Sequence, residues 1–217
     1  MDRHDVFRSD RVRVTERLIV SCDAAKVLEL GAGDYSFDYL KQPGQGSWTK
    51  VDFAPPCDTA CDLNSDTLVL PFDDGNFDLI ICTEVLEHVL WPQRLLQEAR
   101  RVLSDQGRVL VSVPNCCSLS YRVAWLLGRI PSCAASENLP PELGSTTYLR
   151  QDGSTIGGHV IDFTLRRTRS LLQYSGLKVE QVRGCGIFWH RQALPTWLVP
   201  VGLSSNIICL AAKDRRE

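Results

Sequence analysis

The stretch VLELGAGDYS, residues 27–36, joins an apolar run to two glycines that are separated by one residue. VLEL is typical of a short strand, and glycines directly after a strand let the backbone N–H groups approach a ligand. An acid at the end of the following strand can bind ribose hydroxyls, and Asp52 stands 19 residues after Gly33. Gly31, Gly33 and Asp52 therefore predict a turn that binds a nucleotide.

Two classes of nucleotide are compatible with this turn. A dinucleotide places its pyrophosphate at the start of the following helix and commonly requires a third glycine there, whereas this chain has Asp34 in the turn and Ser36 behind it. A carboxylate that faces a pyrophosphate is repulsive. Glu29 favours a ligand that carries a positive ammonium or sulfonium group.

Outward from the turn, apolar runs and helical periodicities alternate. Strands are expected at 27–30, 48–53, 77–82, 109–113, 177–182 and 206–212, and helices at 5–22, 92–103, 119–130 and 165–175. Because parallel strands need helical crossovers, this order predicts an α/β fold with a doubly wound sheet in a single domain, residues 1–217. The helical and loop segment at about 118–158, rich in Pro, Gly, Ser and Thr in its second part, is expected to be an insertion that acts as a substrate lid.

Composition limits the partners and the compartment. The chain has 24 Lys and Arg against 26 Asp and Glu, so the net charge of −2 predicts no attraction to bulk nucleic acid. No apolar run reaches the roughly 18 residues of a membrane span, and the N-terminus lacks the pattern of a secretion signal. Nine scattered cysteines are then expected to be reduced and mostly buried, in a cytoplasmic protein.

Four segments in a fixed order resemble the class I S-adenosylmethionine-dependent methyltransferases: VLELGAG, VDFAPP, LPFDDGNFDLIICTEVLEHV and ARRVLSDQGRVLVSVPN. The resemblance covers residues 27–115 and, more loosely, residues 159–182. It implies a Rossmann-like, doubly wound sheet of seven strands, mostly parallel, whose last strand is antiparallel and forms a hairpin with the sixth. LKVEQV and NIICLAA fit those two strands.

The same resemblance assigns S-adenosylmethionine as cofactor and distributes its contacts. It places the methionine part on Glu29, Gly31 and Gly33, the ribose on Asp52, the adenine on Phe53, the adenine edge on Asp62 and the Leu63 amide, and the methionyl side on Cys82 and Thr83. The chain departs from the family at Tyr35, where members usually have a third glycine. We expect this tyrosine to face solvent and to leave cofactor binding intact.

The resulting hypothesis is methyl transfer to an oxygen, nitrogen or carbon atom of a small molecule, such as a quinone precursor or a sugar. His159, at the end of the expected lid, is the first candidate base and His88 the second, with a structural role as the alternative for either histidine. Three rival hypotheses remain: a catalytically silent methyltransferase-like partner subunit, a nicotinamide-dependent oxidoreductase, and a metal-dependent methyltransferase that acts on the 2′-hydroxyl of an RNA end.

The segment TEVLEHV, residues 83–89, raises the possibility of a divalent metal ion. If a helical turn begins there, Glu84, Glu87 and His88 share one face, and His159 could complete a mixed oxygen and nitrogen site for Mg²⁺, Mn²⁺ or Zn²⁺. The pattern is similar to metal sites in small-RNA 3′-end 2′-O-methyltransferases and in some ubiquinone-pathway O-methyltransferases. In other members of the fold, a histidine at this position only hydrogen-bonds the backbone.

Overall fold

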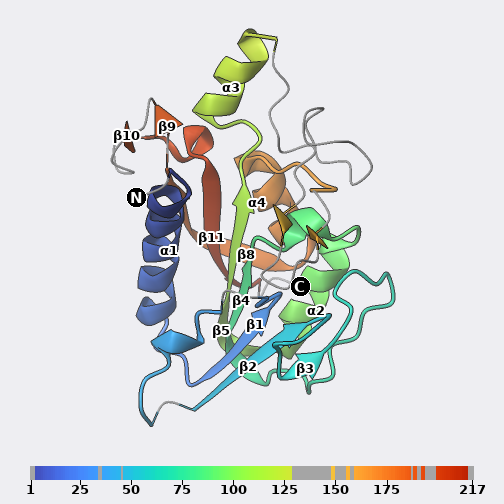
Figure 1. The fold of residues 1–217 in the computed structure, drawn as a ribbon. Coiled ribbons are helices and arrows are strands. Elements are labelled where there is room, and N and C mark those ends of the chain that lie inside the picture. The colour runs from blue at the N-terminus through green and yellow to red at the C-terminus, as the bar shows by residue number, and fades with distance from the viewer. Residues whose placement is uncertain are drawn as a thin grey trace.

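A computed structural model shows a central seven-stranded sheet with helices on both faces (Figure 1). The strand order is β3-β2-β1-β4-β5-β11-β8. β11 runs antiparallel to both of its neighbours, whereas the pairs among β3, β2, β1, β4 and β5 are parallel. The structure describes residues 3–33, 36–44, 46–128, 148–149, 155–156, 159–186, 188–189, 192–193 and 199–214. The doubly wound, mostly parallel sheet with an antiparallel last strand is therefore confirmed.

The elements of the sheet and its helices follow one another along the chain as the sequence periodicities predict. Their bounds are α1 Arg3–Ser21, β1 Lys26–Leu30, η1 Asp38–Leu40, β2 Ser47–Asp52, β3 Thr59–Ala60, β4 Phe77–Thr83, η2 Leu86–His88, α2 Pro92–Val102, β5 Leu103–Pro114, α3 Leu119–Leu126, α4 Leu165–Tyr174, β8 Leu177–Cys185, η5 Val201–Leu203 and β11 Asn206–Lys213. Two short ladders accompany them: β6 Tyr148–Leu149 with β7 Thr155–Ile156, and β9 Phe188–Trp189 with β10 Gln192–Ala193.

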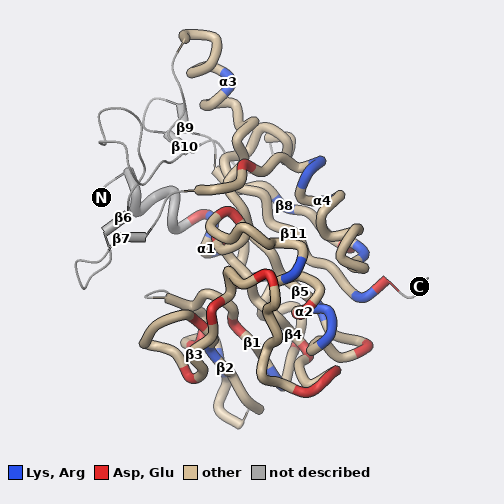
Figure 2. Tube along the Cα trace, turned by 90° about the vertical axis from the view of Figure 1, so that its right-hand side faces the viewer, with Lys and Arg blue, Asp and Glu red and all other residues tan. Residues whose placement is uncertain are grey.

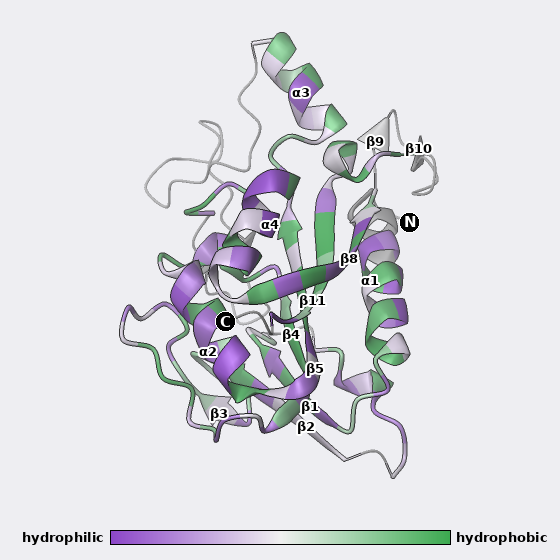
Figure 3. Ribbon diagram, turned by 180° about the vertical axis from the view of Figure 1, so that it is seen from behind, coloured by the Kyte–Doolittle hydropathy of each residue, from purple (hydrophilic) through white to green (hydrophobic). Residues whose placement is uncertain are grey.

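Alternate residues of the central strands point into two separate cores. In β4, Ile80 and Cys82 pack on the face covered by α2 and α4, and Leu79 and Ile81 pack on the face covered by α1. The strands of this sheet are consequently apolar on both sides, as expected where helices cover both faces. Figure 3 shows the green, hydrophobic strands enclosed between helices whose outward faces are purple.

Two local expectations differ from the structure, and the structure adds one strand that the sequence does not predict. Residues 104–107 were expected to separate a helix from a strand, yet β5 begins directly at Leu103 and absorbs them through an irregularity in its pairing with β4. The helix expected at 119–130 ends at Leu126. The edge strand Thr59–Ala60 has no periodicity of its own, because two residues are too few to show one.

The segment at 118–158 is only partly described, so the substrate lid stays a prediction. Its first element, α3, projects beyond the carboxyl edge of the sheet (Figure 1). Trp125 and Leu126 on that helix are exposed. Eight cysteines lie among the described residues, all as free thiols; three are buried and five partly buried.

Within the described residues, none of the helices combines the length and the apolar character needed to cross a membrane.

Candidate functional site

The turn after β1 has the conformation that its glycines allow. Gly31 and Gly33 both have positive φ angles, +67° and +47°, which favour glycine. The Gly31 N–H donates to the Val51 carbonyl at 2.8 Å, which fixes the start of the turn against β2. A Cβ atom at Gly31 would lie 2.4 Å from Val85 Cγ2, so the turn passes directly against the segment that follows β4. Asp34 and Tyr35 lie outside the described residues.

Glu29 lies beneath this turn and holds it in place. Its side chain is buried, and its carboxylate accepts hydrogen bonds from Ser36 Oγ at 2.6 Å, the Phe37 N–H at 3.0 Å and Trp48 Nε1 at 2.9 Å. Burial raises the pKa of Glu29, and these three donors act in the opposite direction. The carboxylate is therefore occupied by the protein itself. We assign it to positioning the turn, although the resemblance places it beside the methionine part of the cofactor.

Asp52, at the end of β2, joins the glycine turn to the next loop. One carboxylate oxygen accepts from the Gly33 N–H at 2.9 Å, and the other accepts from the Phe53 N–H at 2.6 Å. The Phe53 side chain is 63% exposed. A buried acid thus stands beside an exposed aromatic ring and a glycine turn at the carboxyl edge of the sheet, as the sequence predicts.

The remaining residues predicted to bind the cofactor differ in accessibility. Asp62 is exposed and accepts from the Asn64 N–H at 2.9 Å, and Leu63 is buried. Cys82 is fully buried within the core, and burial raises the pKa of its thiol. A contact between Cys82 and a ligand would therefore use backbone atoms. Thr83, the last residue of β4, is partly exposed at the edge.

After β4 the chain does not form the helical turn on which the four-residue metal site was based. Glu84 adopts a left-handed φ of +55°, and only residues 86–88 form a 3₁₀ turn. The Glu84 carboxylate accepts from Ser112 Oγ at 2.7 Å and Asn206 Nδ2 at 3.0 Å, and it forms an ion pair with Arg11 at 2.9 Å. Glu84 thus links α1, β5 and β11.

Sequence reasoning missed the partners that hold Glu84 and Glu29. No feature of the sequence distinguishes Arg11 from the other charged residues of α1. Its ion pair with Glu84 becomes evident only in the folded chain. The negative charge of Glu84 raises the pKa of Arg11, against the opposing effect of burial. Asn206 begins β11 and could have drawn attention, because a polar residue at the end of an apolar strand is often placed there for a hydrogen bond.

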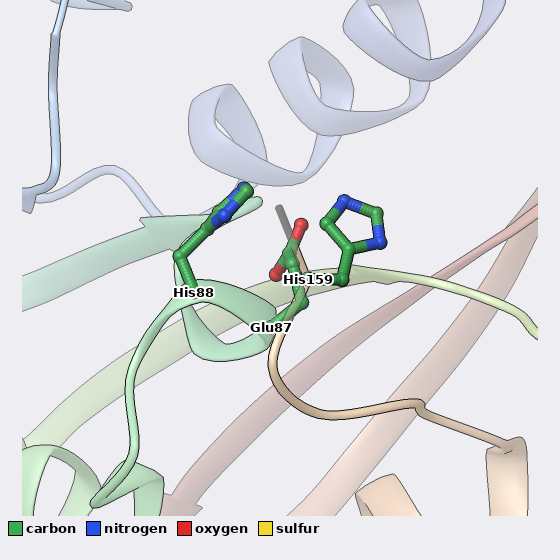
Figure 4. A group of neighbouring side chains, drawn as sticks. All are labelled: Glu87, His88 and His159. Carbon is green, nitrogen blue, oxygen red and sulfur yellow. The ribbon is translucent and has the colours of Figure 1, made fainter. Parts of the chain in front are cut away.

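Glu87, His88 and His159 lie together beside this link. One ligand atom from each can be chosen so that all three lie within 4.8 Å of one another. The two imidazole rings are 5.0 Å apart between centroids and inclined at 75°. Figure 4 shows the Glu87 carboxylate lying between the two rings. The two candidate bases therefore occupy one place at the carboxyl edge.

Comparison with known proteins agrees with this geometry. Residues 28–111 match the family model of the methyltransferase domain. A ubiquinone/menaquinone biosynthesis C-methyltransferase of Ruegeria is 33% identical over 95 residues, which cover 37% of this chain and 38% of that protein. A probable S-adenosylmethionine-dependent methyltransferase of Mycobacterium tuberculosis is 32% identical over 121 residues, which cover 50% of this chain and 42% of that protein. The matches thus span about two fifths of these relatives.

Solved structures extend the likeness to the whole fold. A possible histamine N-methyltransferase of Thermotoga maritima superimposes with a TM-score of 0.56 at 16% identity, covering 92% of this chain and 88% of that chain. The CcbJ methyltransferase of Streptomyces caelestis superimposes with a TM-score of 0.59 at 12% identity, covering 91% and 93%. Residues 28–111 thus match a methyltransferase domain, and the fold of the whole chain is that of solved S-adenosylmethionine-dependent methyltransferases.

Proposed function

We propose that the protein transfers the methyl group of S-adenosylmethionine to a small-molecule acceptor. The observation that carries this proposal is the arrangement at the ends of β1 and β2, where Asp52 holds the Gly33 N–H and stands beside the exposed ring of Phe53. A carboxylate can accept hydrogen bonds from ribose hydroxyls, and an exposed aromatic ring can stack on adenine. The residues present therefore fit the cofactor of the family.

Each residue of the site has a distinct task in this proposal. Asp52 would hold the ribose, Phe53 the adenine face, and Asp62 with the Leu63 amide the adenine edge. Gly31 and Gly33 adopt positive φ angles and have no side chains, so a ligand can approach the backbone of the turn. Glu29 acts through the turn, because its own oxygens already accept hydrogen bonds from Ser36, Phe37 and Trp48.

The cofactor supplies a methyl group that is already activated by a sulfonium sulfur. The chain then has to orient an acceptor and to remove its proton where the acceptor atom is still protonated. His159 and His88 are the candidates for this proton transfer, since they lie close together beside the turn that follows β4, the turn that also contains Val85 next to Gly31. The acceptor atom forms the bond to the methyl carbon, the sulfur keeps the electron pair of the broken bond, and the acceptor proton passes to an imidazole or to solvent.

Charge distribution supports a small acceptor over bulk nucleic acid. The net charge is −2, and Figure 2 shows Lys and Arg on α2, α3 and α4 while many Asp and Glu lie elsewhere on the described residues. A protein that neutralises many phosphates usually carries an excess of basic residues. The Ruegeria relative is described as a quinone-biosynthesis C-methyltransferase, which supports an aromatic quinone precursor as the first acceptor to test. A sugar is the second.

Calorimetric titration tests cofactor binding. The purified protein is titrated with S-adenosylmethionine, S-adenosylhomocysteine and NAD, and we expect micromolar binding of the first two and none of NAD. Asp52→Ala should weaken binding by about 1.5 to 3 kcal/mol, roughly 10- to 150-fold, through loss of charge-assisted hydrogen bonds. The matched control is Asp73→Ala, which removes an exposed acid before the opposite end of β4.

The outcomes separate the rival functions. Failure of both sulfur ligands to bind the folded protein would reject the proposal, and binding of NAD alone would favour the oxidoreductase. Binding without methyl transfer to any acceptor would favour the silent partner subunit. Transfer is measured with methyl-labelled cofactor against quinone precursors, sugars, a short RNA with a 3′-terminal diol, and fractionated cell extract. Label in the RNA alone would replace the small-molecule acceptor with an RNA end.

A further inference from the structure

We propose that Glu87, His88 and His159 bind one divalent transition-metal ion, of the class of Zn²⁺, Co²⁺ or Mn²⁺, at the acceptor side of the site. The role of that ion rests on the proposed methyltransferase function, but its binding does not. The site has three ligands from the protein, one carboxylate and two imidazoles, and it does not include Glu84.

The first support is the state of the Glu87 carboxylate. Its side chain is 1% exposed, and neither of its oxygens has a hydrogen-bond partner. The other two buried glutamates of the described residues are satisfied: Glu29 accepts from three groups, and Glu98 accepts from Arg101 and the Leu70 N–H. A buried carboxylate without partners is costly to maintain, so this one calls for a bound cation or proton.

The second support is the presence of two histidines beside Glu87. One ligand atom from each of Glu87, His88 and His159 lies within 4.8 Å of the other two. For metal–ligand distances of about 2.1 Å, tetrahedral ligand atoms lie about 3.4 Å apart, so the widest pair would close by about 1.4 Å. Rotation of the side chains can supply that movement. In the view of Figure 4 the Glu87 carboxylate appears between the two imidazole rings, so all three side chains border one small space.

The third support is that the backbone holds these residues together. The N–H groups of Val160 and Ile161 both donate to the Glu87 carbonyl, at 2.8 and 3.3 Å, and the His88 N–H donates to the Val85 carbonyl at 2.9 Å. His159 is therefore fixed next to the 3₁₀ turn although it is 71 residues from His88 in the chain. Ligands from two distant segments meet on a hydrogen-bonded frame.

Glu84 is excluded from the ligand set by its own contacts. Its carboxylate is shared among Arg11, Ser112 and Asn206, and binding of an ion there would break the ion pair with Arg11. The donor set that remains contains two nitrogens and one carboxylate. Such a set suits borderline transition metals better than Mg²⁺, which prefers oxygen ligands.

An ion at this place would act on an acceptor hydroxyl. Held by Glu87, His88 and His159, it would supply Lewis-acid chemistry that lowers the pKa of an acceptor hydroxyl, whose proton would pass to solvent. The acceptor oxygen would form the bond to the methyl carbon, and sulfur would retain the electron pair of the broken carbon–sulfur bond. His159 would serve as a ligand in this scheme, and no separate base would be required.

The test uses cobalt as a spectroscopic probe. The untagged protein is stripped with a chelator, titrated with Co²⁺ and followed by its visible absorption, and Zn²⁺ is measured by calorimetry. We expect one ion per chain, with d–d bands and without the sulfur-to-cobalt charge-transfer band that cysteine ligands would produce. Glu87→Gln, His88→Ala and His159→Ala should each weaken Co²⁺ binding on the order of 100-fold or more. Loss of a residue that only hydrogen-bonds a metal ligand already costs about 10- to 100-fold, and loss of a ligand should cost at least as much.

Glu84→Gln is the matched control and should change the affinity less than about threefold, since we place Glu84 outside the ligand set. Titration with S-adenosylhomocysteine shows that each variant is folded. The inference is overturned if Co²⁺ does not bind to protein that binds S-adenosylhomocysteine, if the three variants bind like the wild type, or if folded Glu84→Gln also loses the ion. Loss of S-adenosylhomocysteine binding with Co²⁺ binding intact would reject the proposed function instead.

Discussion

Glu29 and Glu87 are both nearly inaccessible, at 2% and 1% exposed, and both lie near the carboxyl edge of the sheet. Glu29 accepts hydrogen bonds from Ser36, Phe37 and Trp48, and its oxygens face only the protein. Glu87 accepts none from another residue. Burial raises the pKa of both carboxyls. At Glu29 hydrogen bonds from three other residues oppose this effect, whereas at Glu87 the charge of Glu84 adds to it, and only its own backbone N–H and the charge of Arg11 act against it.

The difference indicates two uses of a buried acid. A carboxylate with a full set of donors is part of the scaffold, and its removal should damage the fold. A carboxylate without donors weakens the ligand-free protein, and is best explained by a ligand that supplies the missing partner. We therefore expect Glu29 to support the turn after β1, and we propose Glu87 as a site for chemistry.

The largest effect is expected from Glu29→Gln. The replacement amide presents an N–H₂ group to donors, so at least one buried donor loses its partner, and we expect a loss of about 3 kcal/mol in the free energy of unfolding. Chemical denaturation measures this. The control is Trp48→Phe, which removes one donor and keeps the acid, and which should cost less. Equal stability of Glu29→Gln and the wild type would remove Glu29 from the scaffold.

A smaller loss of stability is expected at Gly31, where the turn after β1 packs against the segment after β4. Gly31→Ala combines a positive φ with a Cβ that meets Val85, and should destabilise the protein by about 2 kcal/mol while weakening S-adenosylhomocysteine binding. Gly44→Ala is the matched control: its φ is +80°, but the added Cβ meets nothing within 4 Å, so only the backbone strain remains. Similar losses in both variants would contradict a tight contact at Gly31.

Glu87→Gln should have the opposite sign in the metal-free protein. Because the folded-state pKa of Glu87 lies well above the usual 4.5, the stability that this carboxyl contributes is complete below about pH 4.5 and is lost as the pH rises through the folded-state pKa. The amide of Glu87→Gln has no charge in this pH range, so the variant does not lose stability in this way. We expect a gain on the order of 1 kcal/mol at neutral pH, or about 2–4 °C in Tm, that disappears in acid.

Saturating Zn²⁺ should make the wild type more stable than Glu87→Gln, because the wild type gains the free energy of Zn²⁺ binding and the variant does not. Thermal melting at two pH values, with and without Zn²⁺, measures all four cases. A variant that is less stable than the wild type without metal would show that Glu87 is a satisfied scaffold residue, like Glu29.

The smallest effect on the fold is expected from Phe53→Ala. The ring is 63% exposed, so the free energy of unfolding should change by less than about 0.5 kcal/mol. Loss of stacking should still cost about 1 kcal/mol of S-adenosylhomocysteine affinity, roughly fivefold. Tyr174→Ala removes another exposed aromatic ring, on α4, and should leave the affinity unchanged. Unchanged affinity in Phe53→Ala would remove the ring from the adenine site.

The scaffold side of this comparison could be predicted from the sequence, and the chemical side only in part. The turn from β1 through Gly33 and the acid Asp52 are local or follow strand periodicity, so their positions could be inferred. The partners of Glu84 could not, because Arg11, Ser112 and Asn206 meet it only through tertiary packing. The helical turn expected at 83–89 failed because Glu84 takes a left-handed φ, which spacing along the chain does not reveal.

The proximity of His159 to His88 was predicted from the family pattern, and the structure adds its physical basis. Val160 and Ile161 bind the backbone of Glu87, so the segment after the insertion is anchored to the turn after β4. Neither hydrogen bond has a signature in the sequence. The exclusion of Glu84 from the histidine cluster likewise became evident only from its side-chain contacts.

The most direct test of the account is a crystal structure of the protein soaked with Mn²⁺ and S-adenosylhomocysteine, with diffraction recorded to locate manganese by its anomalous signal. We predict one peak within about 2.5 Å of a Glu87 oxygen and of one nitrogen each from His88 and His159, and electron density for the nucleoside beside Asp52 and Phe53. Nucleoside density beside Asp52, with no manganese peak among Glu87, His88 and His159, would contradict the assignment of Glu87 as a metal ligand.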